Sequence, residues 1–165
     1  MTVAVRRARN GFVLIVTCVA LTILLGFAGL GIDIARMYVI KSELQAFTDA
    51  AALTAAMELD GGSSGIARAH GAAAQLASGP HAMKWDMGTK TISEIHESFA
   101  EGSQWPDPKT WAAEPKEPAG RRFVRITASA PAPLVFLRIF QPREASTVAA
   151  SSVAMKTSDS ARLME

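Results

Sequence analysis

The chain has 165 residues and a formal net charge of +2, and three of its 17 Lys and Arg residues, Arg6, Arg7 and Arg9, precede the first acidic residue. From residue 33 onward the chain has 15 acidic residues and the remaining 14 basic ones, so this part is nearly neutral. The positive net charge comes from the three arginines before it and is no argument for nucleic-acid binding. Cys18 is the only cysteine, which excludes an intramolecular disulfide.

Residues 11–32 form an apolar run without an ionisable side chain. As a helix this run spans about 33 Å, close to the ~30 Å hydrocarbon thickness of a bilayer. We therefore expect a transmembrane helix over residues 11–32, with the basic tail at residues 1–10 on the cytoplasmic side. A cleaved secretory signal is the alternative, since Gly29 and Gly31 are small enough to precede a cleavage site. An uncleaved anchor fits better, because the run is longer than a signal core and the helical pattern continues beyond it.

Residues 33–60 continue the helical pattern outside the membrane and end at Asp60-Gly61-Gly62. Apolar residues recur there at spacings of three and four, at Ile34, Met37, Ile40, Leu44, Phe47, Ala51, Ala55 and Leu59. A stripe of this kind needs a covering partner, and we expect its lower half to pack against its own domain.

The same region resembles a known family. Its pattern of an apolar segment, Asp33, Arg36 and Tyr38, then Leu44-Gln45 and the run Asp-Ala-Ala-Ala-Leu at residues 49–53 is similar to the N-terminal anchor of TadG-like and TadE-like tight-adherence (Flp) pilus assembly proteins. The resemblance implies a bacterial, single-pass inner-membrane protein with a pilin-like helix, whose partners are the lipid bilayer and other pilus-assembly proteins or pilins.

Two departures from related proteins limit what the resemblance implies. Pseudopilins cut by a prepilin peptidase carry Glu five residues after the Gly, whereas Val16 holds that place after Gly11. The chain also lacks the Asp-x-Ser-x-Ser metal motif of larger TadG proteins. Peptidase processing and a von Willebrand A domain are therefore not implied.

Residues 61–156 are expected to form a small α+β domain outside the membrane. It begins with a second, Ala-rich helix capped by Ser63-Ser64 and stopped by Gly79-Pro80, followed by a hairpin within residues 81–93. Residues 92–99 suit either a helix or a strand, and residues 101–120 form a Pro-rich loop. Its Trp105 and Trp111 either pin the loop to the domain, which we favour, or grip a partner.

The rest of the domain is expected to complete a small antiparallel sheet. The alternation over residues 121–130 predicts a strand that Pro131 and Pro133 end, and residues 134–140 form an apolar helix or turn closed by Pro142. Residues 145–155 form a final strand, and residues 157–165 are expected to be a flexible tail.

The chain carries no convincing enzymatic motif. Gly26, Gly29 and Gly31 have the wrong spacing for a dinucleotide loop and lie within the apolar run, where they suit close helix packing. His96-Glu97 begins like a zinc-protease helix, but Ala100 replaces the second His. We therefore expect no enzyme, no cofactor and no metal.

The leading hypothesis is a membrane-anchored, pilin-like structural component of a Tad-type pilus system. The alternative is a membrane-anchored binding or sensing module, unrelated to pili, whose recognition surface is the Pro-rich loop with its two tryptophans. The candidate packing or interaction residues are Asp33, Arg36, Tyr38, Leu44, Phe47, Asp49, Trp105 and Trp111. Asp49 interrupts an Ala-rich stretch although Ala is the better helix former. We therefore expect it to bond a Lys, Arg or backbone amide of the domain outside the membrane or of a neighbouring subunit, and so to fix the register of packing along the helix.

The arginine cluster makes a testable prediction about topology. A reporter that is active only outside the cytoplasm, fused after residue 160, should be active, because the positively charged flank of a transmembrane helix stays in the cytoplasm. Full-length protein should fractionate with membranes. An active cytoplasmic reporter at the same position would contradict the orientation, and a shortened soluble product would favour the cleaved signal.

Overall fold

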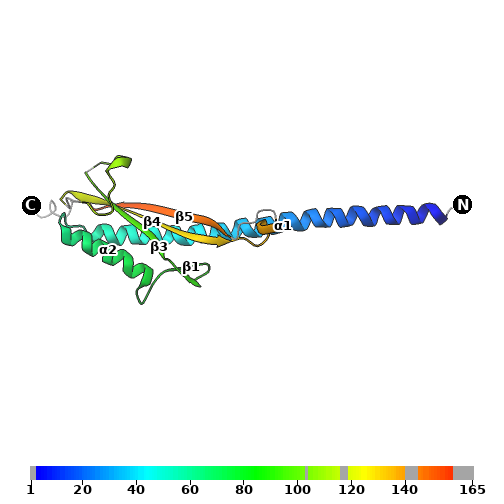
Figure 1. Ribbon diagram of the computed structural model, residues 1–165, viewed down its shortest axis with the longest axis horizontal. Helices are drawn as coiled ribbons and strands as arrows, with labels where there is room; N and C mark the ends of the chain where they lie inside the picture. The colour runs from blue at the N-terminus through cyan, green and yellow to red at the C-terminus, as the bar shows by residue number, and fades with distance from the viewer. Residues whose placement is uncertain (1–2, 103, 116–118, 140–144, 158–165) are drawn as a thin grey trace, which may run out of the picture. The chain divides into compact units, whose positions relative to one another are not determined.

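The computed structural model describes residues 3–102, 104–115, 119–139 and 145–157. These form an α+β fold, which confirms the predicted class (Figure 1). In chain order the elements are helices α1 (Val3–Glu58) and α2 (Ser63–Ser78), strands β1 (Lys84–Trp85), β2 (Lys90–Thr91) and β3 (Glu94–Glu101), the 3-10 turn η1 (Pro108–Thr110), β4 (Arg121–Pro133), the 3-10 turn η2 (Leu137–Ile139) and β5 (Ala145–Met155).

The chain divides into two compact units. The first consists of residues 1–37 and 133–146, and the second of residues 38–132 and 147–165. Helix α1 contributes to both, since it continues from Val3 to Glu58. It therefore begins before the expected start of the apolar run and ends two residues before the expected stop. Residues 158–165 of the predicted tail at 157–165, and Phe140 and Pro142, lie outside the described residues.

The core of the second unit is the apolar stripe of α1, beneath the three-stranded sheet (Figure 1). Six of the eight predicted stripe residues are buried: Ile40, Leu44, Phe47, Ala51, Ala55 and Leu59. The stripe begins later than expected, because Ile34 is exposed and Met37 is only half-buried. Both belong to the first unit, whereas the buried stripe residues belong to the second.

The sheet has the order β3-β4-β5, with β4 in the centre. β3 and β4 are antiparallel, from Glu94 opposite Ser129 to Glu101 opposite Arg121. The ambiguous segment is thus a strand. The prediction that Pro131 and Pro133 end the central strand was wrong, because β4 continues to Pro133. Pairing with β3 stops at Ser129, so a proline beyond that point removes no hydrogen bond to β3.

Helix α2 turns a face of small residues inward, with Gly65, Ala69, Ala73 and Ala77 buried. The predicted Ser63-Ser64 cap was wrong: Gly62 holds the N-cap position without a side-chain bond. Asp60 organises this corner instead, accepting bonds from the Gly62 N–H at 2.8 Å and from Arg68 Nη2 at 2.8 Å. The bond from Arg68, followed by that from Gly62, lowers the pKa of Asp60.

The predicted hairpin is confirmed, since β1 and β2 pair antiparallel around a turn at residues 86–89. Asp86 and Met87 adopt positive φ of 55° and 56° there. The Met87 N–H donates to Glu43 Oε1 at 3.0 Å, which fastens the turn to α1 within the second unit. A hairpin of two-residue strands is marginal alone, so this long-range bond helps to hold it.

The buried stripe makes a prediction about stability. Replacing Leu44 or Phe47 by Ala should lower the free energy of unfolding by about 2–5 kcal/mol, because both side chains are fully buried. Leu53→Ala is the matched control: Leu53 lies on the same helix but is exposed, and its loss should stay within about 0.5 kcal/mol. Urea unfolding of the full chain in detergent, followed by Trp fluorescence, measures all three. Near-zero losses for Leu44 and Phe47 would contradict a self-contained core.

Candidate functional site

The first part of α1 is long and apolar enough to cross a membrane. The Gly11–Glu58 portion contains an 18-residue window with a mean hydropathy of 2.6, of which only 6% is buried. The core helix of a soluble protein would be mostly buried. The bare surface of residues 11–28 therefore argues against that interpretation.

Asp33 lies immediately after the apolar run and is 1% exposed. Its carboxylate accepts three consecutive backbone N–H groups, from Val135 at 3.0 Å, Phe136 at 2.9 Å and Leu137 at 2.6 Å. All four residues belong to the first unit. The Leu137 bond most of all, followed by those of Val135 and Phe136, holds the pKa of Asp33 below its usual range against the opposing effect of burial.

The three N–H groups belong to residues 134–139, which we call the apolar turn. Leu134 is buried, and the Ile139 N–H bonds the Phe136 carbonyl at 3.1 Å to close the 3-10 turn. The ring of Phe136 lies against Gly29 of α1 so closely that a Cβ at position 29 would collide with it. Gly29 therefore serves close packing within the protein, as the sequence suggested for these glycines in general terms.

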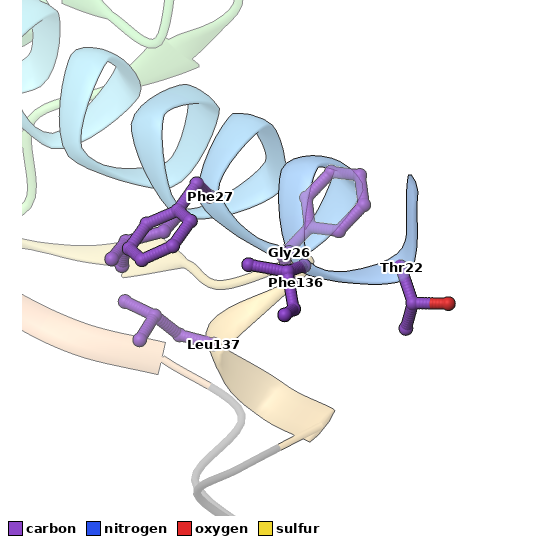
Figure 2. A pocket seen from close by; sticks show the side chains of 7 residues that line it. Thr22, Gly26, Phe27, Phe136 and Leu137 are labelled. Carbon is purple, nitrogen blue, oxygen red and sulfur yellow. The ribbon is translucent and has the colours of Figure 1, made fainter. Parts of the chain in front are cut away.

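An apolar hollow of 430 Å³ lies beside this contact. Its lining residues are Thr22, Ile23, Gly26, Phe27 and Leu30 of α1 with Phe136 and Leu137 of the apolar turn (Figure 2). Thr22 is the only polar side chain among them, and its hydroxyl donates to the Cys18 carbonyl at 2.9 Å. The hollow therefore offers no charge or free donor for a polar ligand, and its chemistry suits hydrocarbon.

Of the other predicted residues on α1, Arg36 is half-buried and Tyr38 is exposed. Asp49 is also exposed, and its carboxylate accepts from the Ser152 hydroxyl and from Gln45 Nε2 at 2.9 Å. Thr48 also bonds Ser152, at 2.7 Å between the two hydroxyl oxygens. Within this chain the side-chain partners of Asp49 are thus an amide and a hydroxyl. The predicted Lys, Arg or backbone amide partner, which could also come from a neighbouring subunit, stays a prediction.

The two tryptophans of the Pro-rich loop behave differently. Trp111 is half-buried and carries the Arg125 guanidinium at 3.9 Å from its ring centroid. Trp105 remains 72% exposed, although its ring meets Phe123 edge-on at 6.4 Å. Trp111 therefore contacts the domain through Arg125, whereas Trp105 presents most of its surface to the surroundings.

Sequence reasoning missed the apolar turn as a partner of Asp33, and it missed Ser152. The available signal was the apolar segment at residues 134–139, which is flanked by prolines and has no polar side chain except Arg138. Within the described residues, no three His, Cys, Asp or Glu side chains gather where they could hold a metal ion.

Comparison with known proteins identifies one family. Residues 11–58 match the family model described as "Putative Flp pilus-assembly TadE/G-like", which confirms the resemblance of the N-terminal region. No curated protein and no solved structure matches the chain. The matched region extends from Gly11, where the apolar run begins, to Glu58, the last residue of α1, and it includes Asp33 and Asp49.

The Asp33 carboxylate makes a prediction about local order and pH. Asp33→Asn should reduce the hydrogen-exchange protection of the Val135, Phe136 and Leu137 amides, because the Asn side chain has one acceptor oxygen and no charge, whereas the Asp33 carboxylate accepts with both oxygens. In the parent, protection should be complete above about pH 4 and fall as the pH decreases through the lowered pKa of Asp33, since a depressed carboxylate pKa stabilises only its ionised form. Hydrogen exchange with mass spectrometry measures this. Asp49→Asn is the control, and equal protection in the Asp33 variant would contradict the role.

Proposed function

We propose that this chain is a single-pass, membrane-anchored, pilin-like structural component of a Tad-type (Flp) adhesive pilus system in a bacterial inner membrane. The observation that carries the proposal is the division of α1 within the family match. Residues 11–28 are bare and apolar, whereas Ile40, Leu44, Phe47 and the residues that follow them in the stripe are buried. A pilin-like subunit requires such a helix, in which the first part anchors the protein in the membrane and the second part forms the core of the domain outside it.

The proposed orientation has the N-terminus in the cytoplasm and the second unit in the periplasm or outside the cell. It rests on the charges that flank the apolar run, with Arg6, Arg7 and Arg9 before it and a mixture of acidic and basic residues after it. The nearly neutral second unit then needs no nucleic acid or anionic surface as a partner.

The contact surface for other pilus proteins is proposed to be the outer face of α1 at Asp49, Leu53 and Met57. These residues are spaced four apart, so they share one face, and all three are exposed. The bond from Asp49 to Ser152 fixes β5 beside this face. Two exposed apolar side chains next to an ordered carboxylate suit a protein partner, with the charge setting the register.

A binding or sensing module remains the second candidate, and the exposed ring of Trp105 is the observation that favours it. A recognition loop would depend on that ring, because aromatic side chains dominate the energy of many interfaces. Trp105→Ala should therefore leave piliation unchanged if the chain is a pilus component.

The proposed contact face is tested by complementing a deletion strain with single variants. Asp49→Asn and Leu53→Glu should each reduce surface pili and adhesion while membrane insertion and Trp fluorescence stay unchanged. The first removes the charge that bonds Ser152, and the second places a charge in an apolar contact. Met87→Glu, at an exposed site on the hairpin, is the matched control. Normal piliation in both test variants would remove this face from the mechanism, and normal piliation in the deletion strain would overturn the pilus function.

A further inference from the structure

The apolar turn exposes side chains that water does not favour. Val135 is 54% exposed and Ile139 is 76% exposed, and Phe27 of α1, which lines the hollow with the turn, is exposed as well. All three belong to the first unit, in which α1 supplies the apolar run. The exposed surface of the turn therefore continues the bare surface of the run, and one environment has to suit both.

The depth of the turn along α1 follows from its contacts. Phe136 lies against Gly29, three residues before the end of the apolar run. The hollow that it shares with α1 reaches Thr22, ten residues before that end, or about 15 Å along the helix at 1.5 Å per residue. Half of a ~30 Å hydrocarbon layer is also about 15 Å. The turn thus lies beside the part of α1 that would be in lipid.

The backbone of the turn is prepared for such a place. Hydrocarbon offers no hydrogen bonds, so irregular backbone is tolerated there only when its polar groups are satisfied within the protein. The N–H groups of Val135, Phe136 and Leu137 bond the Asp33 carboxylate, and that of Ile139 bonds the Phe136 carbonyl. Asp33 thereby supplies the acceptors that water would supply to an ordinary surface turn.

We propose that the apolar side chains of residues 134–139 are inserted into the hydrocarbon layer, on the side of the membrane away from the arginine cluster, and that phospholipid acyl chains fill the hollow between Phe27 and Phe136. The exposed side chain of Arg138 then extends to the headgroup level. The inference rests on the membrane anchoring in the proposed function. It adds a second membrane contact, made by a turn 100 residues after the anchor in sequence, in which Asp33 is the positioning residue. Acyl chains are the fitting occupant because the lining offers no unpaired donor or charge and is continuous with the lipid-facing helix.

The experiment uses three full-length proteins with one spin label each, reconstituted in vesicles of phosphatidylethanolamine and phosphatidylglycerol. The label is attached to native Cys18, to Ile139→Cys in a Cys18→Ala background, or to Met87→Cys in the same background. Collision rates are measured with oxygen, which concentrates in hydrocarbon, and with a water-soluble nickel chelate. We expect labels at 18 and 139 to collide preferentially with oxygen and the label at 87 preferentially with nickel. Adding Asp33→Asn should shift the label at 139 toward nickel.

Each other outcome has one meaning. A nickel preference at 139 with an oxygen preference at 18 overturns the inserted turn and leaves the anchor intact. A nickel preference at 18 overturns the anchor itself. Dipolar broadening between labels at 139 in dilute vesicles means that a second copy covers the turn, which also overturns the lipid assignment. A label at Val135→Cys guards against a local effect of the Ile139 change and should repeat its oxygen preference.

Discussion

The constraint on which this structure depends is that one continuous helix must be bare over one part and covered over another. α1 continues from Val3 to Glu58 with a bare apolar surface over residues 11–28 and a fully buried stripe from Ile40 onward. The sheet covers the stripe because Leu44 and Phe47 provide large side chains and Ala51 and Ala55 allow close approach. Burial of such a stripe, rather than helix propensity, stabilises a helix of this length.

Asp33 stands where the surface of the helix changes character, and its burial has to be compensated. An isolated buried carboxylate is strongly unfavourable, but three backbone N–H donors replace the water that it loses. The same bonds lower its pKa, so the carboxylate remains ionised throughout the neutral range. The contact therefore does not depend on pH in the neutral range, whereas a contact made by a His side chain would change as the imidazole gains or loses its proton. It holds the apolar turn against Gly29 at every pH that a cell maintains.

Local patterns predicted the elements of this fold well. The stripe, the hairpin and the strands β4 and β5 follow from periodicity and turn chemistry, which act over a few residues, whereas the pattern of residues 92–99 suited a helix as well as the strand β3. Three features could not be found in this way. The bonds of Asp33 reach 102 to 104 residues along the chain, the pairing of β4 with β3 stops at Ser129, before Pro131, and Asp60 accepts bonds from both Arg68 and the N-cap residue Gly62. Each depends on tertiary position, which a single sequence does not reveal.

The family match ends at residue 58, so it includes Asp33 but not the turn that Asp33 holds. A carboxylate that bonds backbone N–H groups makes little demand on the partner's side chains, because every residue except proline offers the same donor. Such a contact allows the turn to vary in sequence while the acid and the packing glycine beside it stay useful. The exposed side chains of the turn, Val135 and Ile139, can therefore change without loss of the backbone bonds that Asp33 accepts.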